Sequence, residues 1–219
     1  MIALALEAST YSGSVAVIRD GVVIAEGDTA MRGEREERLM PAVAEALAAA
    51  GVAPNEIDRV VCGAGPGSFT SLRIAGAIAK GLAMATGVPL YAVSSLFLVI
   101  AGARPVVAPG RYVAALDAMR GDVFATAFSV TDAAIVAESR AMIVAKTDLA
   151  GFAHEHSARL AGPGEAIALV PHARGVAALG SRSPWPDASD LASWEPDYGR
   201  LAEAQVRWEA AHGRALMPR

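Results

Sequence analysis

Two carboxylic acids stand where an apolar stretch gives way to a polar turn. Glu7 ends one such stretch and is followed by Ser9 and Ser12, and Asp117 ends another in the second half of the chain. Oxygen ligands of this kind suit a magnesium ion, which is a hard cation. These residues raise the hypothesis of a magnesium and phosphate site, either working or vestigial.

A glycine-rich loop supplies a second set of candidate ligands. Gly65 and Gly67 follow the apolar run Val60–Cys62, and Ser68 or Thr70 can cap the helix expected next. Backbone N–H groups at the start of a helix can hold an anion. The loop is equally consistent with a tight turn that binds nothing.

The helix expected between this loop and Gly87 has two apolar sides. One side, which includes Leu72 and Ala75, can face a sheet. The other carries small residues at helical spacing, which would let a second helix approach closely. A helix with two apolar sides is buried on both, either inside its own domain or against another protein. The small-residue side consists of Gly76, Ala77, Lys80, Gly81 and Met84.

Composition bounds the class of protein. The chain has 219 residues, is 53% apolar and 19% charged, and carries a net charge of −4. It can therefore build one large domain or two small lobes, and it has no general attraction to nucleic acid. The lone cysteine, Cys62, excludes an internal disulfide and fits a reducing cytoplasm. Because Glu7 interrupts the apolar N-terminus and no apolar run reaches the ~20 residues that span a bilayer, we expect a soluble cytoplasmic protein without membrane contact.

The order of apolar runs and turns predicts a mixed sheet covered by helices. Three hairpin strands over residues 2–26 come first, and a helix and two strand–helix units follow, which require parallel crossovers. The stretch 104–110, with two prolines, is the best candidate boundary. We expect an N-terminal lobe at 1–103 and a smaller C-terminal lobe with a tail at 104–219.

The second half repeats the first in outline. A strand, an acid, an alanine, a glycine turn and another strand occur around Glu7 and again around Asp117, and Gly-Pro-Gly occurs at 65–67 and at 162–164. Two matching elements in the same order indicate an internal duplication. This arrangement resembles the actin-like ATPase and sugar kinase superfamily, which implies an α/β fold with duplicated lobes of mixed β-sheets flanked by helices.

Enzymatic alternatives follow from the same residues. An ATP-dependent small-molecule kinase or ATPase would use Glu7, Asp117 and the glycine loops, although the second loop is short and no catalytic base is evident. A metal enzyme would need clustered histidines. The closest pair, His154 and His156, shares no helix face, so no metal site is expected. A peptidase would need a nucleophile beside a base, and the sequence offers neither at a recognisable spacing.

Longer motifs give a more specific resemblance. The run from Gly65 to Ile74 (Gly-Pro-Gly-Ser-Phe-Thr-Ser-Leu-Arg-Ile) and the later Lys80-Gly81-Leu82-Ala83 resemble the signature of the TsaB (YeaZ) family. Residues 117–123 are similar to that family's second-lobe motif, and residues 38–41 to the start of its first helix. The resemblance is densest over residues 1–130.

The resemblance implies a non-catalytic subunit of the machinery for tRNA threonylcarbamoyladenosine. Its partner would be TsaD, which transfers the threonylcarbamoyl group to adenosine 37 of tRNA. TsaE would join through TsaD, and tRNA would bind through the complex. A homodimer is an alternative when the chain is alone. No tightly bound cofactor is implied, although ATP or ADP at the complex interface is left open.

Two sets of site residues follow from the resemblance. The partner interface would contain Arg35, Leu39, Met40, Val43, Leu47, Leu72, Arg73, Gly76, Ala77, Lys80, Gly81 and Met84. A vestigial nucleotide loop would contain Glu7, Ser9, Ser12, Gly65, Gly67, Ser68 and Asp117. Glu7 and Ser71 stand where the family usually has Asp and Gly, which fits a lobe that no longer handles nucleotide.

Overall fold

The computed structural model describes residues 1–33, 36–179, 188–200, 208 and 211–213. Its first half is a five-stranded sheet in the order β3-β2-β1-β4-β5. The two hairpins pair antiparallel, and β1 pairs with β4, and β4 with β5, in parallel. The strands are β1 (Ile2–Glu7), β2 (Ser12–Arg19), β3 (Val22–Ala30), β4 (Arg59–Gly63) and β5 (Leu90–Val93).

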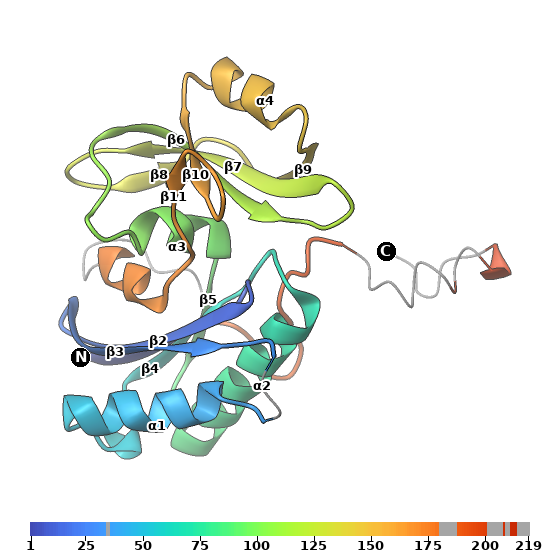
Figure 1. The fold of residues 1–219 in the computed structure, drawn as a ribbon. Helices are drawn as coiled ribbons and strands as arrows, with labels where there is room; N and C mark the ends of the chain where they lie inside the picture. Colours follow the sequence, from blue (N-terminus) through green and yellow to red (C-terminus); the bar gives the residue numbers. More distant parts are fainter. Residues whose placement is uncertain (34–35, 180–187, 201–207, 209–210, 214–219) are drawn as a thin grey trace.

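Two helices cover one face of this sheet, α1 (Leu39–Ala50) and α2 (Phe69–Thr86). Side chains alternate along β1, so that Leu4 and Leu6 meet these helices while Ala3 and Ala5 point to the opposite face. Both helices end at a glycine with positive φ, the conformation that favours a glycine after a helix. Figure 1 shows α1 and α2 together at the bottom of the molecule.

The opposite face of the first sheet packs on α3 (Ser95–Ala101) and on the 3-10 helix η2 (Ala173–Leu179). A short 3-10 turn, η1 (Pro54–Glu56), precedes β4. Although α3 comes from the first half of the chain, Leu96, Val99 and Ile100 also pack into the core of the second half. Conversely, η2 returns from the second half to the first sheet. The division at 104–110 remains a prediction.

The second sheet repeats the strand order of the first. It runs β11-β10-β6-β7-β8, with β9 also paired to β7. Read from β8 toward β11, a hairpin of antiparallel strands is again followed by parallel strands. Its strands are β6 (Gly110–Asp117), β7 (Asp122–Val130), β8 (Ile135–Ala137), β9 (Met142–Ala145), β10 (Arg159–Gly162) and β11 (Ile167–Ala168).

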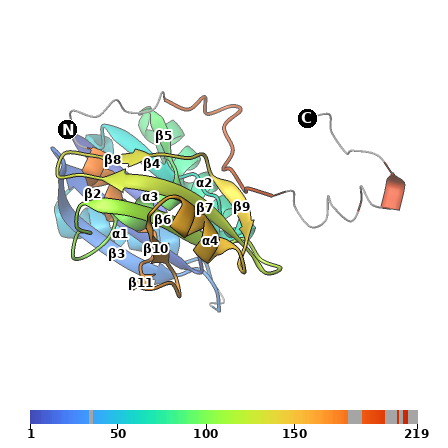
Figure 2. The ribbon, with the colours of Figure 1, turned by 90° about the horizontal axis from the view of Figure 1, so that it is seen from above.

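The predicted α/β fold class is therefore confirmed: the protein has duplicated lobes of mixed β-sheets flanked by helices. Helix α4 (Leu149–Glu155) covers the outer face of the second sheet. The layers run from α1 and α2 through the first sheet, α3 with η2, and the second sheet to α4 (Figure 1). Seen from above, β6 and β7 lie across the first lobe (Figure 2). Among the described residues, no helix is long and apolar enough to cross a membrane.

Candidate functional site

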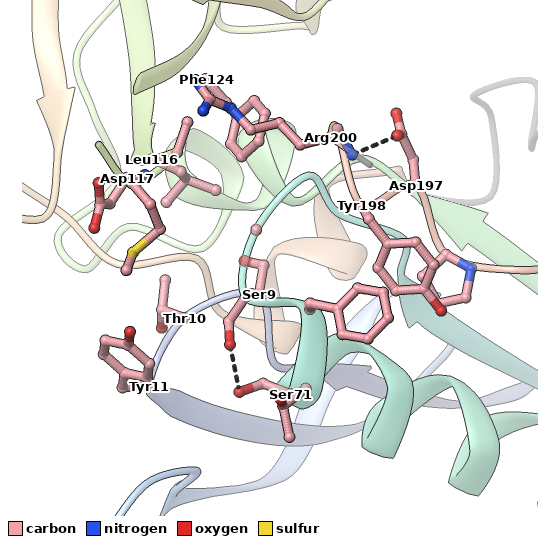
Figure 3. A pocket seen from close by; sticks show the side chains of 18 of the residues that line it. Ser9, Thr10, Tyr11, Ser71, Leu116, Asp117, Phe124, Asp197, Tyr198 and Arg200 are labelled. Atoms are coloured by element: carbon pink, nitrogen blue, oxygen red, sulfur yellow. Dashed lines mark hydrogen bonds between the residues drawn. The ribbon is translucent and has the colours of Figure 1, made fainter. Parts of the chain in front are cut away.

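A cleft of ≈ 1640 Å³ lies between the two lobes. The first lobe lines it with the turn after β1, residues 9–11, and with the start of α2, residues 67–71. The second lobe contributes residues 116–120, at the end of β6 and the turn that follows. A third stretch, residues 196–200, also reaches the cleft from late in the chain (Figure 3).

The glycine loop at the base of α2 uses its donors inside the protein. The N–H of Gly65 donates to Ser95 Oγ at 3.0 Å, and the N–H of Ser68 donates to the main-chain oxygen of Ser9 at 2.7 Å. Gly67 approaches Ser9 so closely that a Cβ there would lie 2.2 Å from the Ser9 oxygen. Ser68 occupies the N-cap position of α2, but its side chain makes no capping hydrogen bond and pairs with Ser71 Oγ at 3.1 Å. Two loop donors are thus not directed at a ligand.

Glu7 is buried beneath the cleft and does not line it. Its Oε1 accepts the N–H of Ser9 at 2.5 Å, and its Oε2 accepts the hydroxyl of Ser95 at 2.8 Å. Burial raises the pKa of the Glu7 carboxyl above its ordinary value, against the smaller lowering effect of these hydrogen bonds. A Cβ on Gly63 would lie 1.7 Å from Oε2, so a side chain at that position on the neighbouring strand would force the Glu7 carboxylate to move.

The seven residues expected in a vestigial nucleotide loop therefore divide. Ser9, Gly67, Ser68 and Asp117 line the cleft. Glu7, Ser12 and Gly65 do not line it: Glu7 and Gly65 are buried, and Ser12 is exposed at the start of β2. Asp117 is exposed, and its Oδ1 accepts the N–H of Met119 within the turn at 2.9 Å. Glu7 is thus buried inside the protein, whereas the Asp117 carboxylate stabilises the turn that follows it.

The expected interface residues also divide into covered and uncovered groups. Arg35 lies outside the described residues. Met40, Arg73, Ala77, Gly81 and Met84 are exposed on α1 and α2. Leu39, Val43 and Leu47 are buried because the apolar side of α1 packs on the first sheet, and Leu72 is buried beside Gly65 at the start of α2. These four side chains hold the helices in position, and their part in a partner interface stays a prediction.

The remaining two expected interface residues are covered by the chain itself. Gly76 is buried, and a Cβ added to it would lie 3.0 Å from Cγ of Pro196. Lys80 is half-buried and donates from Nζ to the main-chain oxygen of Trp194 at 3.0 Å. The small-residue side of α2 is thus split into a covered edge and an open edge. No local pattern indicates that part of α2 is covered by a later segment, because residues 181–194 are predicted only as loop.

Comparison with protein families places this geometry among known proteins. Residues 31–176 match the family model described as TsaD: tRNA N6-adenosine threonylcarbamoyltransferase. A Bacillus subtilis protein named tRNA threonylcarbamoyladenosine biosynthesis protein TsaB is 30% identical to this chain, over 95% of this chain and 98% of its own length. The Escherichia coli protein of the same name is 37% identical over 55% of this chain and 52% of its own length.

Solved structures agree over most of the fold. The structure of YeaZ from Pseudomonas aeruginosa has a TM-score of 0.73 and 26% sequence identity, covering 90% of this chain and 99% of its own. Another Pseudomonas aeruginosa structure, described as having similarity to peptidase YEAZ, has a TM-score of 0.74 and 25% identity, covering 91% and 99%. The likeness thus extends over both lobes.

Proposed function

Since the chain belongs to the TsaB (YeaZ) family, we propose that it serves tRNA threonylcarbamoyladenosine biosynthesis as a non-catalytic cytoplasmic subunit that binds TsaD. Support comes from the names of its relatives and from the match to the TsaD family model. The proposal assigns the pairing to the open edge of α2 together with the neighbouring face of α1.

The observation that carries the proposal is an uncovered apolar stripe along α2. Met84 is 68% exposed, and a Cβ on Gly81 would have no neighbour within 4 Å. Ala77 continues the stripe one turn earlier. Small residues beside an exposed methionine allow the axis of a second helix to come close, and methionine adapts to the partner's surface.

Helix α1 offers a matching surface on the same side of the sheet. Met40 is 41% exposed, and Ala44 and Ala48 are exposed one and two turns later. Both helices pack their opposite sides into the same core cluster, which fixes their outward faces relative to each other. Two adjacent helices with exposed small and apolar residues suit an interface with two helices of a partner.

The cleft supports an accessory role rather than phosphoryl transfer. Glu7 is buried and bonded to Ser9 and Ser95, and the loop donors of Gly65 and Ser68 are used internally. Among the described residues, no three His, Cys, Asp or Glu side chains converge as metal ligands. No observation favours the kinase alternative over the scaffold. On this proposal TsaE and tRNA are reached through TsaD, and any ATP or ADP belongs to the interface of the complex.

The test mixes the purified chain with TsaD from the same organism and follows the mixture by size-exclusion chromatography with light scattering. A heterodimer, together with threonylcarbamoyl transfer to tRNA that requires both proteins, is the expected result. A chain that ignores TsaD and hydrolyses ATP or phosphorylates a small molecule by itself would contradict the proposal. A homodimer of the chain alone that dissociates on adding TsaD would indicate that both assemblies use the same helix face.

A further inference from the structure

Residues 189–200, here called the clasp, cross from one lobe to the other without forming a helix or strand. They begin beside the outer strand of the first sheet, where the N–H of Ser189 donates to the main-chain oxygen of Leu90 at 2.7 Å. Asp190 then organises a turn, because its main-chain oxygen accepts the N–H of Trp194 at 2.8 Å and its carboxylate accepts the Ser193 hydroxyl at 2.7 Å. The turn presents Trp194 to α2.

The middle of the clasp is fastened to the first lobe. Trp194 packs against the core cluster beneath α2, and its main-chain oxygen receives the Lys80 hydrogen bond. Three residues later, the N–H of Asp197 donates to the main-chain oxygen of Ala64 in the glycine loop at 2.7 Å. The Tyr198 ring lies against the Phe69 ring, with centroids 4.5 Å apart. These contacts place the clasp along the start of α2.

The end of the clasp is fastened to the second lobe. Gly199 lies between the lobes: a Cβ there would be 2.4 Å from Cε1 of Phe124 on β7 and 2.9 Å from Cβ of Pro66 in the glycine loop. Arg200 forms an ion pair with Asp122 at the start of β7. Figure 3 shows the Arg200 side chain beside Phe124, with Asp197 and Tyr198 farther along the same stretch.

The clasp also covers the glycine loop. The main-chain oxygen of Asp197 lies where it would be 2.1 Å from a Cβ on Gly65. The loop is thus packed against a carbonyl oxygen and an acidic residue of the same chain, a surrounding that disfavours an anion. The lobes are joined on the other side by α3 and η2, which pack between the two sheets. The clasp reaches the cleft on the side away from η2 (Figure 1).

We propose that the clasp is a conformational device that fixes the two lobes at one separation and closes the glycine-loop side of the cleft. Actin-like lobes joined on one side alone could open about that connection. The contacts of the clasp with Ala64, Lys80, Phe124 and Asp122 prevent this opening. The inference does not depend on pairing with TsaD, since every contact named is within this chain.

The first part of the test asks whether the clasp lies against the glycine loop in solution and whether this position depends on Gly199. Hydrogen exchange of the Asp197 amide reports the bond to Ala64. We expect protection in the full-length protein and a loss of protection of about tenfold or more in Gly199→Ala, because the new methyl group collides with the buried Phe124 ring. Gly21→Ala is the matched control: its φ is also positive, at +83°, and nothing lies within 4 Å of its Cβ. Rapid exchange in the unaltered protein, or unchanged protection in Gly199→Ala, would overturn the proposal.

The second part measures the lobes. Spin labels on Tyr11→Cys and Met119→Cys, both exposed residues that line the cleft from opposite lobes, give the inter-lobe distance distribution, while the native Cys62 is buried. A narrow distribution that becomes broader and longer in Gly199→Ala, but not in Gly21→Ala, is expected. Arg200→Met, which removes the ion pair without adding bulk beside Phe124, should give a smaller change in the same direction. A distribution that stays narrow after the Asp197 amide has lost protection would refute the role in fixing the lobes.

Discussion

The ammonium group of Lys80 donates a hydrogen bond to the main-chain oxygen of Trp194, 114 positions later, at 3.0 Å. This contact turns the only charged side chain on the small-residue side of α2 toward the clasp. It leaves Ala77, Gly81 and Met84 as the open edge of that helix. The small-residue side of α2 is therefore divided: one edge contacts the clasp, and the other edge is exposed.

Lys80→Met tests the internal contact. It keeps most of the aliphatic stem but leaves the Trp194 oxygen without this donor. We expect the free energy of unfolding in urea to fall by about 1 kcal/mol, the usual net worth of such a bond. Lys146→Met is the control, since Lys146 is the only other lysine and is exposed. Equal stability of the two variants would show that the Lys80 bond contributes nothing.

Glu7→Gln should raise stability at neutral pH. Folding raises the pKa of the Glu7 carboxyl above its ordinary value of 4.5. At a pH above about 4.5 the folded state therefore binds more protons than the unfolded state. The free energy of unfolding consequently falls as the pH rises from there. Glutamine can accept the Ser9 N–H and donate to Ser95 Oγ without carrying charge. The variant should therefore gain over the parent protein with rising pH, and the gain should vanish near pH 4. Thermal unfolding from pH 4 to 8 measures this gain. Melting temperatures of the variant and the parent protein that run parallel over this pH range would contradict the prediction.

Titration of His172 should make stability depend on pH in the opposite direction. It is buried on the segment that leads into η2, with Nε2 3.1 Å from Asp28 Oδ1, and Nδ1 accepts the Arg174 N–H at 3.0 Å. Burial, with the nearby Arg174 guanidinium, lowers the pKa of His172 below 6.5, while Asp28 and Glu26 oppose this. The unfolded state then binds the extra proton, so stability falls as the pH drops below about 6.5.

His172→Asn provides the measurement. Its amide oxygen can accept the Arg174 N–H in place of Nδ1, but it does not titrate. Combining it with Glu7→Gln removes the opposing pH dependence of stability that Glu7 contributes. We expect a flatter dependence of the melting temperature on pH between 5 and 7 than in Glu7→Gln alone, and an unchanged slope would exclude His172 as its source.

Adjacent residues on α1 separate core packing from partner contact. Leu39 is fully buried, and Leu39→Ala should lower the free energy of unfolding by roughly 2–5 kcal/mol. Met40 is 41% exposed, and Met40→Ala should change stability by less than about 1 kcal/mol while weakening the complex with TsaD. Urea unfolding and a binding titration on the same samples give both values. A Met40→Ala protein that binds like the parent would move the interface away from α1.

Much of the fold follows from local patterns. The apolar runs of β1 and β2, the glycine after α2 and the repeated acid-turn-glycine unit predict the order of elements along the first lobe and the strand–turn–strand unit that opens the second. The short strands β8 and β9 carry no such pattern, because three or four residues at a sheet edge are specified mainly by their neighbour β7. The return of η2 to the first sheet likewise depends on contacts distant in sequence.

The candidate site was less predictable for a related reason. Helical spacing places Ala75 on the side of α2 that can face a sheet, but it does not separate the buried residues of α1 from the exposed ones. Leu39 and Val43 meet the sheet, and exposed alanines face outward. The clasp could not be inferred either, because Trp194 and Gly199 reach their positions through tertiary contacts with α2 and Phe124.

The most direct measurement of the central claim is the affinity for TsaD of Gly81→Arg beside Gly151→Arg. Neither glycine has a neighbour within 4 Å of an added Cβ, so both variants should fold, but Gly81 lies on α2 and Gly151 on α4, on the far side of the second sheet. We predict that Gly81→Arg weakens binding by about 100-fold or more, and that Gly151→Arg binds like the parent protein. Parent-like affinity in Gly81→Arg would contradict the assignment of α2 as the partner-binding helix.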